Sequence, residues 1–425
     1  MIPRTQADPT ARPTLPPVLV GVTLVVVSLA VDLTWLLVPW TPAPTGALDP
    51  TAGLPAQAVV RAEGVAAALR LPGLLSTGAG LAALAALVLT APGRRVLAFV
   101  RRVPGGLQPQ VAAQALTALL VVLVVRWPFG VWAETIRRQE GLSVQGWDRF
   151  ARDRLVAAGL EAVLTVVAVL AVVVVARALP RWWPGVVAAV AAGAVVVLSL
   201  LYPLVVEPAL TELTPLPDGP VRTQVEALAV QAGAPVSDVL VADTSTRATT
   251  LNAYVSGLGP TRRTVLQDTL LQAMTPEQVL SVVAHETAHA ASGDVLRGTT
   301  VGALGVAAAV LVLGCAATVA TRRRGGGQVG SSAAAGAVLL VLLLAQQASV
   351  PVDSLLSRQV ERAADVRALE LTDDPQAFAE AMQVLTLTNR ADPSPPAWVQ
   401  WWFGSHPTGA ERVALARSEA DAAGR

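Results

Sequence analysis

Long apolar runs separated by short polar connections make up most of the chain. We predict seven membrane-spanning helices, because a helix rises about 1.5 Å per residue and must cross a hydrocarbon core about 30 Å thick. The runs cover residues 18–38, 71–91, 111–125, 155–176, 186–206, 299–320 and 333–350. A signal peptide is the alternative for the first run. That run is longer than a typical signal h-region and no clear cleavage site follows Trp40, which favours a retained span.

The pattern changes to that of a soluble domain between residues 207 and 298. One amphipathic helix is predicted at 220–233 and three strands at 236–242, 251–256 and 263–266. The last two strands are joined around the turn signal at 257–260. The sequence thus predicts a mainly α, multi-span membrane protein with a small α+β segment.

Four regions follow from this pattern. They are an N-terminal membrane region with five spans (1–206), the α+β segment (207–298), a helical hairpin made of the sixth and seventh spans (299–350) and a C-terminal helical part (351–425). Composition predicts that 41–70 and 134–154 are connections. It also predicts a separate helix at 354–371, beyond the last span.

Composition supports a membrane protein. Hydrophobic residues make up 53 % of the chain and charged residues 14 %, and the mean hydropathy is +0.56, unlike a soluble domain. A net charge of +1 gives no reason to expect nucleic acid as a partner. The single cysteine, Cys315, excludes an internal disulfide and a metal site built from several thiolates.

A helix that starts near residue 275 carries the clearest chemical signal. Thr275 is a good N-cap, Pro276 is tolerated at the first helical position, and Gln278 can complete a capping box. The helix is expected to end near Gly293.

On this helix, His285 and His289 are four residues apart, so their imidazoles project from one face and can hold one metal ion. With Glu286 they form the pattern H-E-x-x-H, in which two imidazoles hold zinc and the glutamate takes a proton from a zinc-bound water. Because the chain has only three histidines, about one chance match is expected in a thousand such sequences. The motif therefore predicts a metallopeptidase centre.

A catalytic zinc needs a third protein ligand and one open position. The short spacing that would supply a third histidine is missing after His289, so we expect a carboxylate. Glu361 and Asp365 lie on one face of a predicted helix, where one could bind the metal and the other could orient a ligand histidine. The alternative is a solvated charged face shared with Arg358 and Arg362.

Five stretches in series carry a resemblance to a known family. They are residues 251–259, residues 262–271, the H-E-x-x-H helix, residues 357–365 and the Ser-His-Pro sequence at 405–407. Together they resemble the membrane-integrated gluzincins, the group of CAAX prenyl endopeptidases and HtpX-type quality-control proteases. Residues 138–143 ahead of Trp147 also resemble the multi-span region of that family.

The resemblance implies a gluzincin-type domain with one zinc ion per chain and a role for each matched residue. By it, Glu361 is the third zinc ligand, and Asp365 orients a ligand histidine through its ring N–H. His406 would stabilise the oxyanion, and Arg412 would support the glutamate ligand or the substrate. Residues 252–254 (Asn252, Ala253 and Tyr254) resemble the edge strand that binds an extended substrate.

We therefore expect a zinc-dependent endopeptidase that cleaves membrane-associated or hydrophobic proteins, with Glu286 as general base. A CAAX-type protease for lipid-modified peptides and a catalytically silent scaffold or chaperone of the same fold are the alternatives. A protease that cuts inside membrane-spanning helices is a further one, but here the motif follows a polar segment.

The expected location is the cell membrane, with the chain crossing the lipid bilayer several times. Arginines near the span ends are almost equally divided between the two sides, so charge does not decide the orientation. The resemblance implies a cytoplasmic active site. The sequence predicts a peptide or membrane-protein substrate and gives no oligomeric state.

Overall fold

The computed structural model describes residues 16–43, 49, 51–203, 207, 212–257, 259–323 and 329–422. Within these residues, seven helices are long and apolar enough to cross a membrane: α1 (Pro17–Leu37), α2 (Ala56–Leu89), α4 (Leu107–Gln139), α5 (Trp147–Ala178), α6 (Trp183–Leu201), α11 (Asp294–Arg323) and α12 (Ala335–Thr372). The prediction of a mainly helical protein with about seven spans is confirmed. Arg4, Arg12 and Arg324, three arginines of the orientation argument, lie outside the described residues.

Several spans extend far beyond the apolar runs. Helix α2 begins at Ala56 and takes up half of the predicted connection 41–70, which is therefore half wrong. Only residues 140–146 separate α4 from α5, so the predicted connection 134–154 is largely wrong. Helices of 32 to 34 residues are about 50 Å long, more than the apolar core of a bilayer. Their polar ends therefore extend beyond that core, where composition does not distinguish helix from loop.

Helix α12 unites two elements that the sequence separates. The expected seventh span and the expected helix 354–371 form one helix of 38 residues with Pro351 inside it. A proline removes one helical hydrogen bond, but packing on both sides of it can maintain the helix. The polar half of α12 thus extends directly from a membrane span. A short helix, α3 (Ala91–Val100), follows α2.

A four-stranded sheet forms the β part, in the order β1-β2-β4-β3. Strands β2 (Asp238–Ala242) and β4 (Arg263–Gln267) are parallel, and β3 (Ala253–Ser256) is antiparallel to β4. The three predicted strands are confirmed, whereas β1 (Leu213–Pro215) was missed because three residues are too few to show alternation. Helix α8 (Pro220–Gln231) confirms the predicted amphipathic helix, and α9 (Asp268–Ala273) follows β4.

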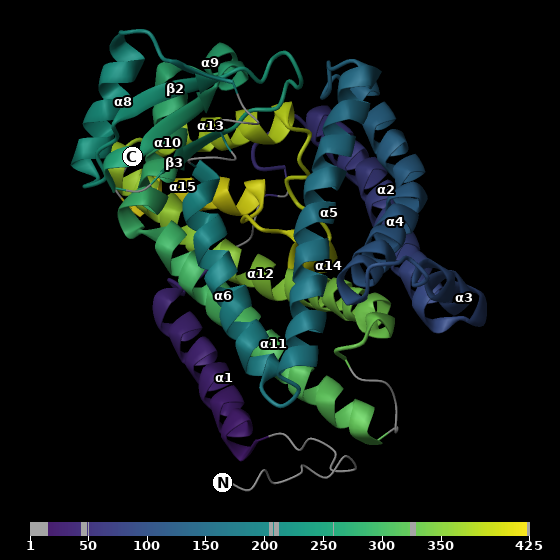
Figure 1. Cartoon of the computed structure of the whole chain (residues 1–425). Helices are drawn as coiled ribbons and strands as arrows, with labels where there is room; N and C mark the ends of the chain where they lie inside the picture. Colours follow the sequence, from purple (N-terminus) through teal and green to yellow (C-terminus); the bar gives the residue numbers. More distant parts are fainter. Residues whose placement is uncertain are drawn as a thin grey trace, which may run out of the picture.

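The catalytic-motif helix, α10 (Pro276–Ser292), lies at the centre of the largest buried core. It packs against β3, α8 and α12, and against α13 (Pro375–Thr388). Helix α15 (Gly409–Ala422) contributes to the same core, and α14 (Ala397–Phe403) packs on α12. Figure 1 shows the sheet and α10 at the upper left, with α13 and α15 close to them and α6 and α11 leading away from this part.

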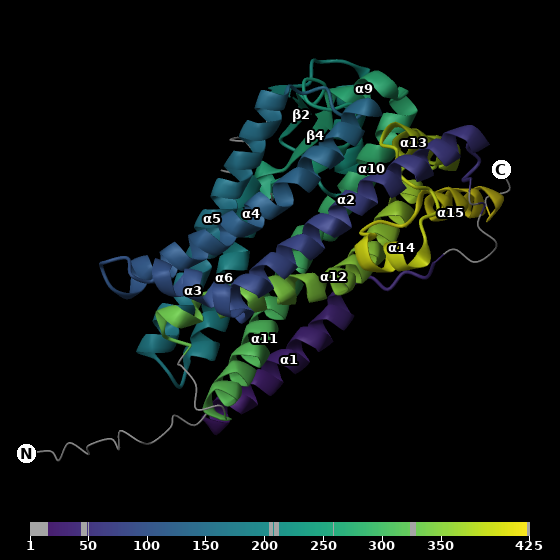
Figure 2. The same ribbon diagram turned by 90° about the vertical axis from the view of Figure 1, so that its right-hand side faces the viewer.

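The sixth and seventh spans, which we expected to form a helical hairpin, pack mainly on other helices. Helix α11 packs on α1 and α6, whereas α12 packs on α2, α4, α5 and α10. Figures 1 and 2 show α11 leading away from the sheet and α12 returning along a different course. The H-E-x-x-H residues on α10 and residues 357–365 on α12 meet because these two helices contact each other directly.

Candidate metal centre

Helix α10 presents the H-E-x-x-H residues from a well-defined start and end. Thr275 accepts a hydrogen bond from the backbone N–H of Gln278, whose side chain accepts one from the N–H of Thr275, so the predicted capping box is confirmed. The helix ends at Gly293 with φ of 69°, a left-handed conformation that glycine adopts without strain. The chain then turns directly into α11.

His285, His289 and Glu361 converge at the contact between α10 and α12. The Nε2 atoms of the two histidines are 3.1 Å apart. Glu361 Oε2 lies 3.2 Å from His285 Nε2, and Glu361 Oε1 lies 3.5 Å from His289 Nε2. One ligand atom from each residue lies within 4.8 Å of the others, so the three side chains could hold a metal ion.

The spacing and the unsatisfied oxygen of this group fit zinc. Ligands about 2.0 to 2.2 Å from a tetrahedral zinc are about 3.3 to 3.5 Å apart, close to the separations of the three residues. Glu361 Oε2 is buried and lacks a hydrogen-bond partner in the described part of the chain, although nitrogen atoms lie nearby. A buried carboxylate oxygen without a partner is costly, and a cation between these atoms would satisfy it.

A carboxylate holds the second ring nitrogen of each motif histidine. His285 Nδ1 lies 2.8 Å from Asp365 Oδ1, and His289 Nδ1 lies 2.9 Å from Asp294 Oδ2. An Nδ1–H donated to each carboxylate leaves both Nε2 lone pairs free to face Glu361, the usual arrangement around ligand histidines. Asp294 was missed by the sequence analysis, although it follows His289 by five residues, immediately after the turn at Gly293.

Arg412 on α15 secures Asp365. Its Nε lies 3.1 and 3.0 Å from the two carboxylate oxygens, and its guanidinium stacks 5.7 Å from the ring of Phe378. Such a paired contact fixes the orientation of a carboxylate. Arg412 therefore supports the partner of His285, and its expected support of the glutamate ligand or the substrate stays a prediction.

The electrostatics of the centre attract a cation. Burial opposes protonation of His285, but the charge and the hydrogen bond of Asp365, together with the nearby Glu361 carboxylate, outweigh it and raise its pKa to about 10. A proton there takes the place that a metal cation could take. Burial also raises the pKa of Glu286, which lies on the same helix and faces the adjoining cavity.

His406 approaches the same carboxylate from the loop between α14 and α15. Its Nε2 lies 3.4 Å from Glu361 Oε2, and its Nδ1 lies 2.9 Å from Ser405 Oγ. Desolvation lowers the pKa of His406, with the positive charge of Arg412 acting in the same direction and Glu361 opposing it. A neutral ring that accepts from Ser405 carries its hydrogen on Nε2 and presents a donor to the centre.

Helix α12 also positions this loop. Arg358 is buried and donates to the backbone oxygen of Gln400 at 2.8 Å, and Ser354 donates to that of Trp402 at 3.0 Å. The Gln400 side chain in turn donates to the backbone oxygen of His406 at 2.7 Å. The alternative of a solvated charged face is therefore wrong for Arg358.

A cavity of about 580 Å³ opens beside the centre and is lined by His285, Glu286, His406 and Arg412. Asn252, next to edge strand β3, also lines it. Ala253 and Tyr254 are not among its lining residues. Burial, together with a hydrogen bond to the Glu207 side chain, raises the pKa of the Tyr254 hydroxyl. Of the three residues proposed for substrate binding, only Asn252 faces the cavity.

Comparison with known proteins identifies this part of the chain. The sequence model of Peptidase family M48 matches residues 215–420, which include α10 and the Glu361, His406 and Arg412 positions. The chain is similar to this family over these residues, which are just under half of its length. The resemblance inferred from the motifs is thus confirmed.

Two curated relatives match over limited parts of their length. A CAAX prenyl protease 1 homolog of Oryza sativa subsp. japonica is 40 % identical over 94 residues, 22 % of each chain. The uncharacterized metalloprotease YhfN of Bacillus subtilis is 26 % identical over 229 residues, 53 % of this chain and 54 % of that protein. The matches therefore span between about a fifth and a half of these relatives.

The crystal structure of Saccharomyces mikatae Ste24p has the same fold. It matches with a TM-score of 0.74 at 18 % identity, over 95 % of this chain and 99 % of that one. At this identity the match establishes the architecture alone. The chain is thus a multi-pass membrane protein whose α10, α12 and α15 bring the M48 residues together.

Proposed function

We propose that this protein is a zinc-dependent membrane endopeptidase with one zinc ion per chain, held by His285, His289 and Glu361. The convergence of two imidazole nitrogens and a carboxylate oxygen that has no hydrogen-bond partner among the described residues, with a carboxylate behind each imidazole, carries this proposal. Three protein ligands leave an open position, which is typical of catalytic zinc. The similarity of residues 215–420 to Peptidase family M48 supports hydrolysis of peptide bonds.

Zinc bound there would act as a Lewis acid and lower the pKa of a coordinated water from about 15.7 to about 7. Glu286 faces the cavity from the same helical turn as His285, where it can take a proton and return it to the leaving amine. Asp365 and Arg412 keep the His285 ring in one tautomer and orientation. His406 would donate from Nε2 to the oxyanion of the scissile carbonyl.

The proposed substrate is an extended segment of a membrane-associated or hydrophobic protein. Strand β3 ends the sheet, so one of its backbone edges can pair with a peptide, and Asn252 lies where that edge meets the cavity. The rice relative is named as a CAAX prenyl protease, which supports lipid-modified peptides as the alternative substrate class.

The four-region division and a cytoplasmic active site belong to the same proposal. Turn 140–146 contacts the second region, because Val144 N–H donates to the backbone oxygen of Arg247 and Thr249 donates to that of Gly141.

Reporters fused after Arg425 test on which side of the membrane the active site lies. Activity confined to the outside of the cell would place the site on the other face.

Hydrolysis of quenched fluorescent peptides by detergent-purified protein tests the function. Glu286→Gln should retain zinc and lose about 10²- to 10⁴-fold in rate, because it removes the base and leaves the ligands. Glu277→Gln, an exposed change on the same helix, is the matched control and should cleave like the wild type. A zinc-loaded wild type that cleaves no tested peptide would favour the scaffold alternative, whereas a fully active Glu286→Gln would contradict Glu286 as the general base.

A further inference from the structure

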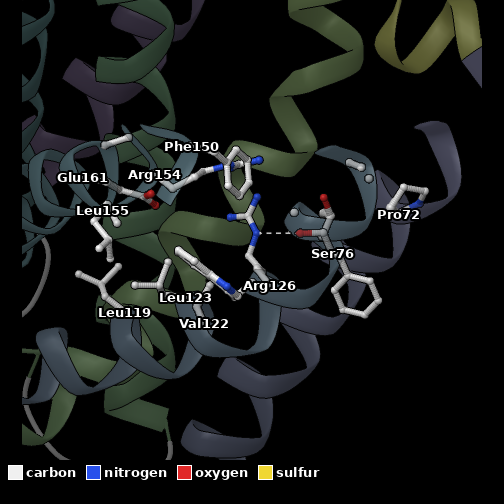
Figure 3. Close-up of a pocket in the computed structure, with 18 of the residues that line it drawn as sticks. Pro72, Ser76, Leu119, Val122, Leu123, Arg126, Phe150, Arg154, Leu155 and Glu161 are labelled. Carbon is white, nitrogen blue, oxygen red and sulfur yellow. Dashed lines mark hydrogen bonds between the residues drawn. The ribbon is translucent and has the colours of Figure 1, made fainter. Parts of the chain in front are cut away.

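A second cavity, of about 610 Å³, lies in the membrane region between α2, α4 and α5 (Figure 3). Most of its lining is apolar and includes Leu119 and Leu123 of α4, Leu155 of α5 and Pro72 of α2. Its volume is within the range of sites that bind small molecules or lipid chains. It is separate from the metal centre, and none of the proposed catalytic residues lines it.

Two guanidinium groups enter this apolar cavity, and neither has a carboxylate partner in the part of the chain that the structure describes. Arg126 of α4 donates from Nε to Ser76 of α2 at 3.2 Å, and Arg154 of α5 lies 5.5 Å from the ring of Phe150. Figure 3 shows both side chains directed into the cavity. Within the described residues, neither forms an ion pair, even though Glu161 lines the same cavity.

The charges of the lining add up to a positive site. Arg126, Arg137 and Arg154 face the cavity against the single carboxylate of Glu161. An unpaired charge at an apolar surface in a membrane is costly, and such residues mark sites that take a partner of opposite charge. The missing partner is therefore an anion that can enter from the membrane region.

The position of the arginines along the helices indicates which anion. Arg126 directly follows the apolar run 111–125 of α4, and Arg154 directly precedes the apolar run 155–176 of α5. Because α4 and α5 pack together and are joined by the seven-residue turn 140–146, both arginines lie at the same end of the two apolar runs. Trp127, which also lines the cavity, is typical of the level of the lipid headgroups.

We propose that this cavity binds an anionic phospholipid, with the phosphate at Arg126 and Arg154 and an acyl chain along the leucines. The order of basic and apolar lining matches the order of phosphate and chain in a membrane lipid. Glu161 lies seven residues, about 10 Å, beyond Arg154 in the apolar run, where its charge repels a phosphate that enters too deeply. The inference does not depend on the proposed peptidase function.

Native mass spectrometry of the full-length protein in neutral detergent tests the site. Dioleoylphosphatidylglycerol should bind at least tenfold more tightly than dioleoylphosphatidylcholine, which has the same chains without net charge. Dioleoylglycerol lacks the phosphate and glycerol 3-phosphate lacks the chains, so both should bind weakly. Equal binding of the two phospholipids, or glycerol 3-phosphate binding as tightly as phosphatidylglycerol, would overturn the proposal.

Variants locate the binding. The double variant Arg126→Gln and Arg154→Gln should lose at least tenfold in affinity for phosphatidylglycerol, whereas the Arg→Lys pair should retain most of it. Arg152→Gln is the matched control, because Arg152 is an exposed arginine on the same helix and does not line the cavity. An equal loss in Arg152→Gln would indicate general surface attraction and overturn the site. If the glutamine pair does not fold, single Arg→Gln variants should each lose severalfold, and unchanged affinity in both would contradict the proposal.

Discussion

The cavity beside the metal centre and the α2/α4/α5 cavity have similar volumes, about 580 and 610 Å³, but their charged side chains differ in whether they are paired. At the metal centre, Asp365 is paired with both His285 and Arg412, and Asp294 is paired with His289. In the other cavity, Arg126 and Arg154 have no carboxylate partner among the described residues. Paired charges fix reacting groups in place, whereas unpaired charges indicate a site that recruits a charged ligand.

The two regions adjoin through a third cavity of about 530 Å³. It shares Arg137, Phe150 and Arg154 with the membrane cavity, and Thr250 and Asn389 with the metal-site cavity. A substitution in one cavity can therefore affect the other, so a substitution in either needs a control.

Replacing Glu361, the proposed carboxylate ligand, should have the largest effect on the metal centre. We expect Glu361→Ala to lose stoichiometric zinc and to reduce peptide hydrolysis to background, because two imidazoles alone hold catalytic zinc weakly. Zinc content by atomic emission and initial rates measure both effects. Asp353→Ala on the exposed face of the same helix should change neither. Full zinc occupancy in Glu361→Ala would show that another residue is the ligand.

His406→Gln should separate catalysis from metal binding, because His406 is proposed to bind the oxyanion and not the zinc. Loss of one oxyanion donor costs about 10²- to 10³-fold in kcat, so we expect that loss with zinc content unchanged. Steady-state kinetics and zinc analysis of the same preparation test this. A variant that loses zinc would place His406 among the ligands.

Weakening one supporting carboxylate should have a smaller effect. Asp294→Asn removes the charged partner of His289 and should lower zinc affinity about 10- to 100-fold, since partners behind ligand histidines typically contribute this much. Competition with a chromophoric chelator gives the affinity, and Asp353→Asn serves as the control. Unchanged affinity would mean that Asp294 has no orienting role.

The change in zinc affinity for each pH unit should be the smallest of these effects. The pKa of His285 in the metal-free protein is raised to about 10, so at neutral pH the ring carries a proton that zinc must displace. Apparent zinc affinity should therefore rise about tenfold per pH unit from pH 6 to 8, with about one proton released per zinc. Calorimetry in two buffers with different ionisation enthalpies measures that proton. Affinity independent of pH would contradict a protonated His285.

The sequence predicted what depends on local spacing. The H-E-x-x-H histidines, the capping box at Thr275 and the alternation of β2 and β4 follow from neighbouring residues, whereas the role of His406 came from the resemblance. The structure brings His285, His289 and Glu361 together as the motifs require.

What the sequence did not predict depends on contacts between distant segments or on a turn. Asp294 reaches His289 only because Gly293 reverses the chain. Arg358 is charged but buried, since it bonds to backbone oxygens of a loop more than forty residues away. Helix α12 continues through Pro351 because packing on neighbouring helices outweighs the local preference of proline.

Zinc K-edge X-ray absorption of the purified protein tests the central claim most directly. We expect a nitrogen and oxygen coordination shell with the scattering of two imidazoles, unchanged in His406→Gln. Three imidazoles in the wild type, or two only after His406 is replaced, would contradict the assignment of Glu361 as the third protein ligand. Absence of bound zinc after purification in a zinc-supplemented buffer would contradict the metallopeptidase itself.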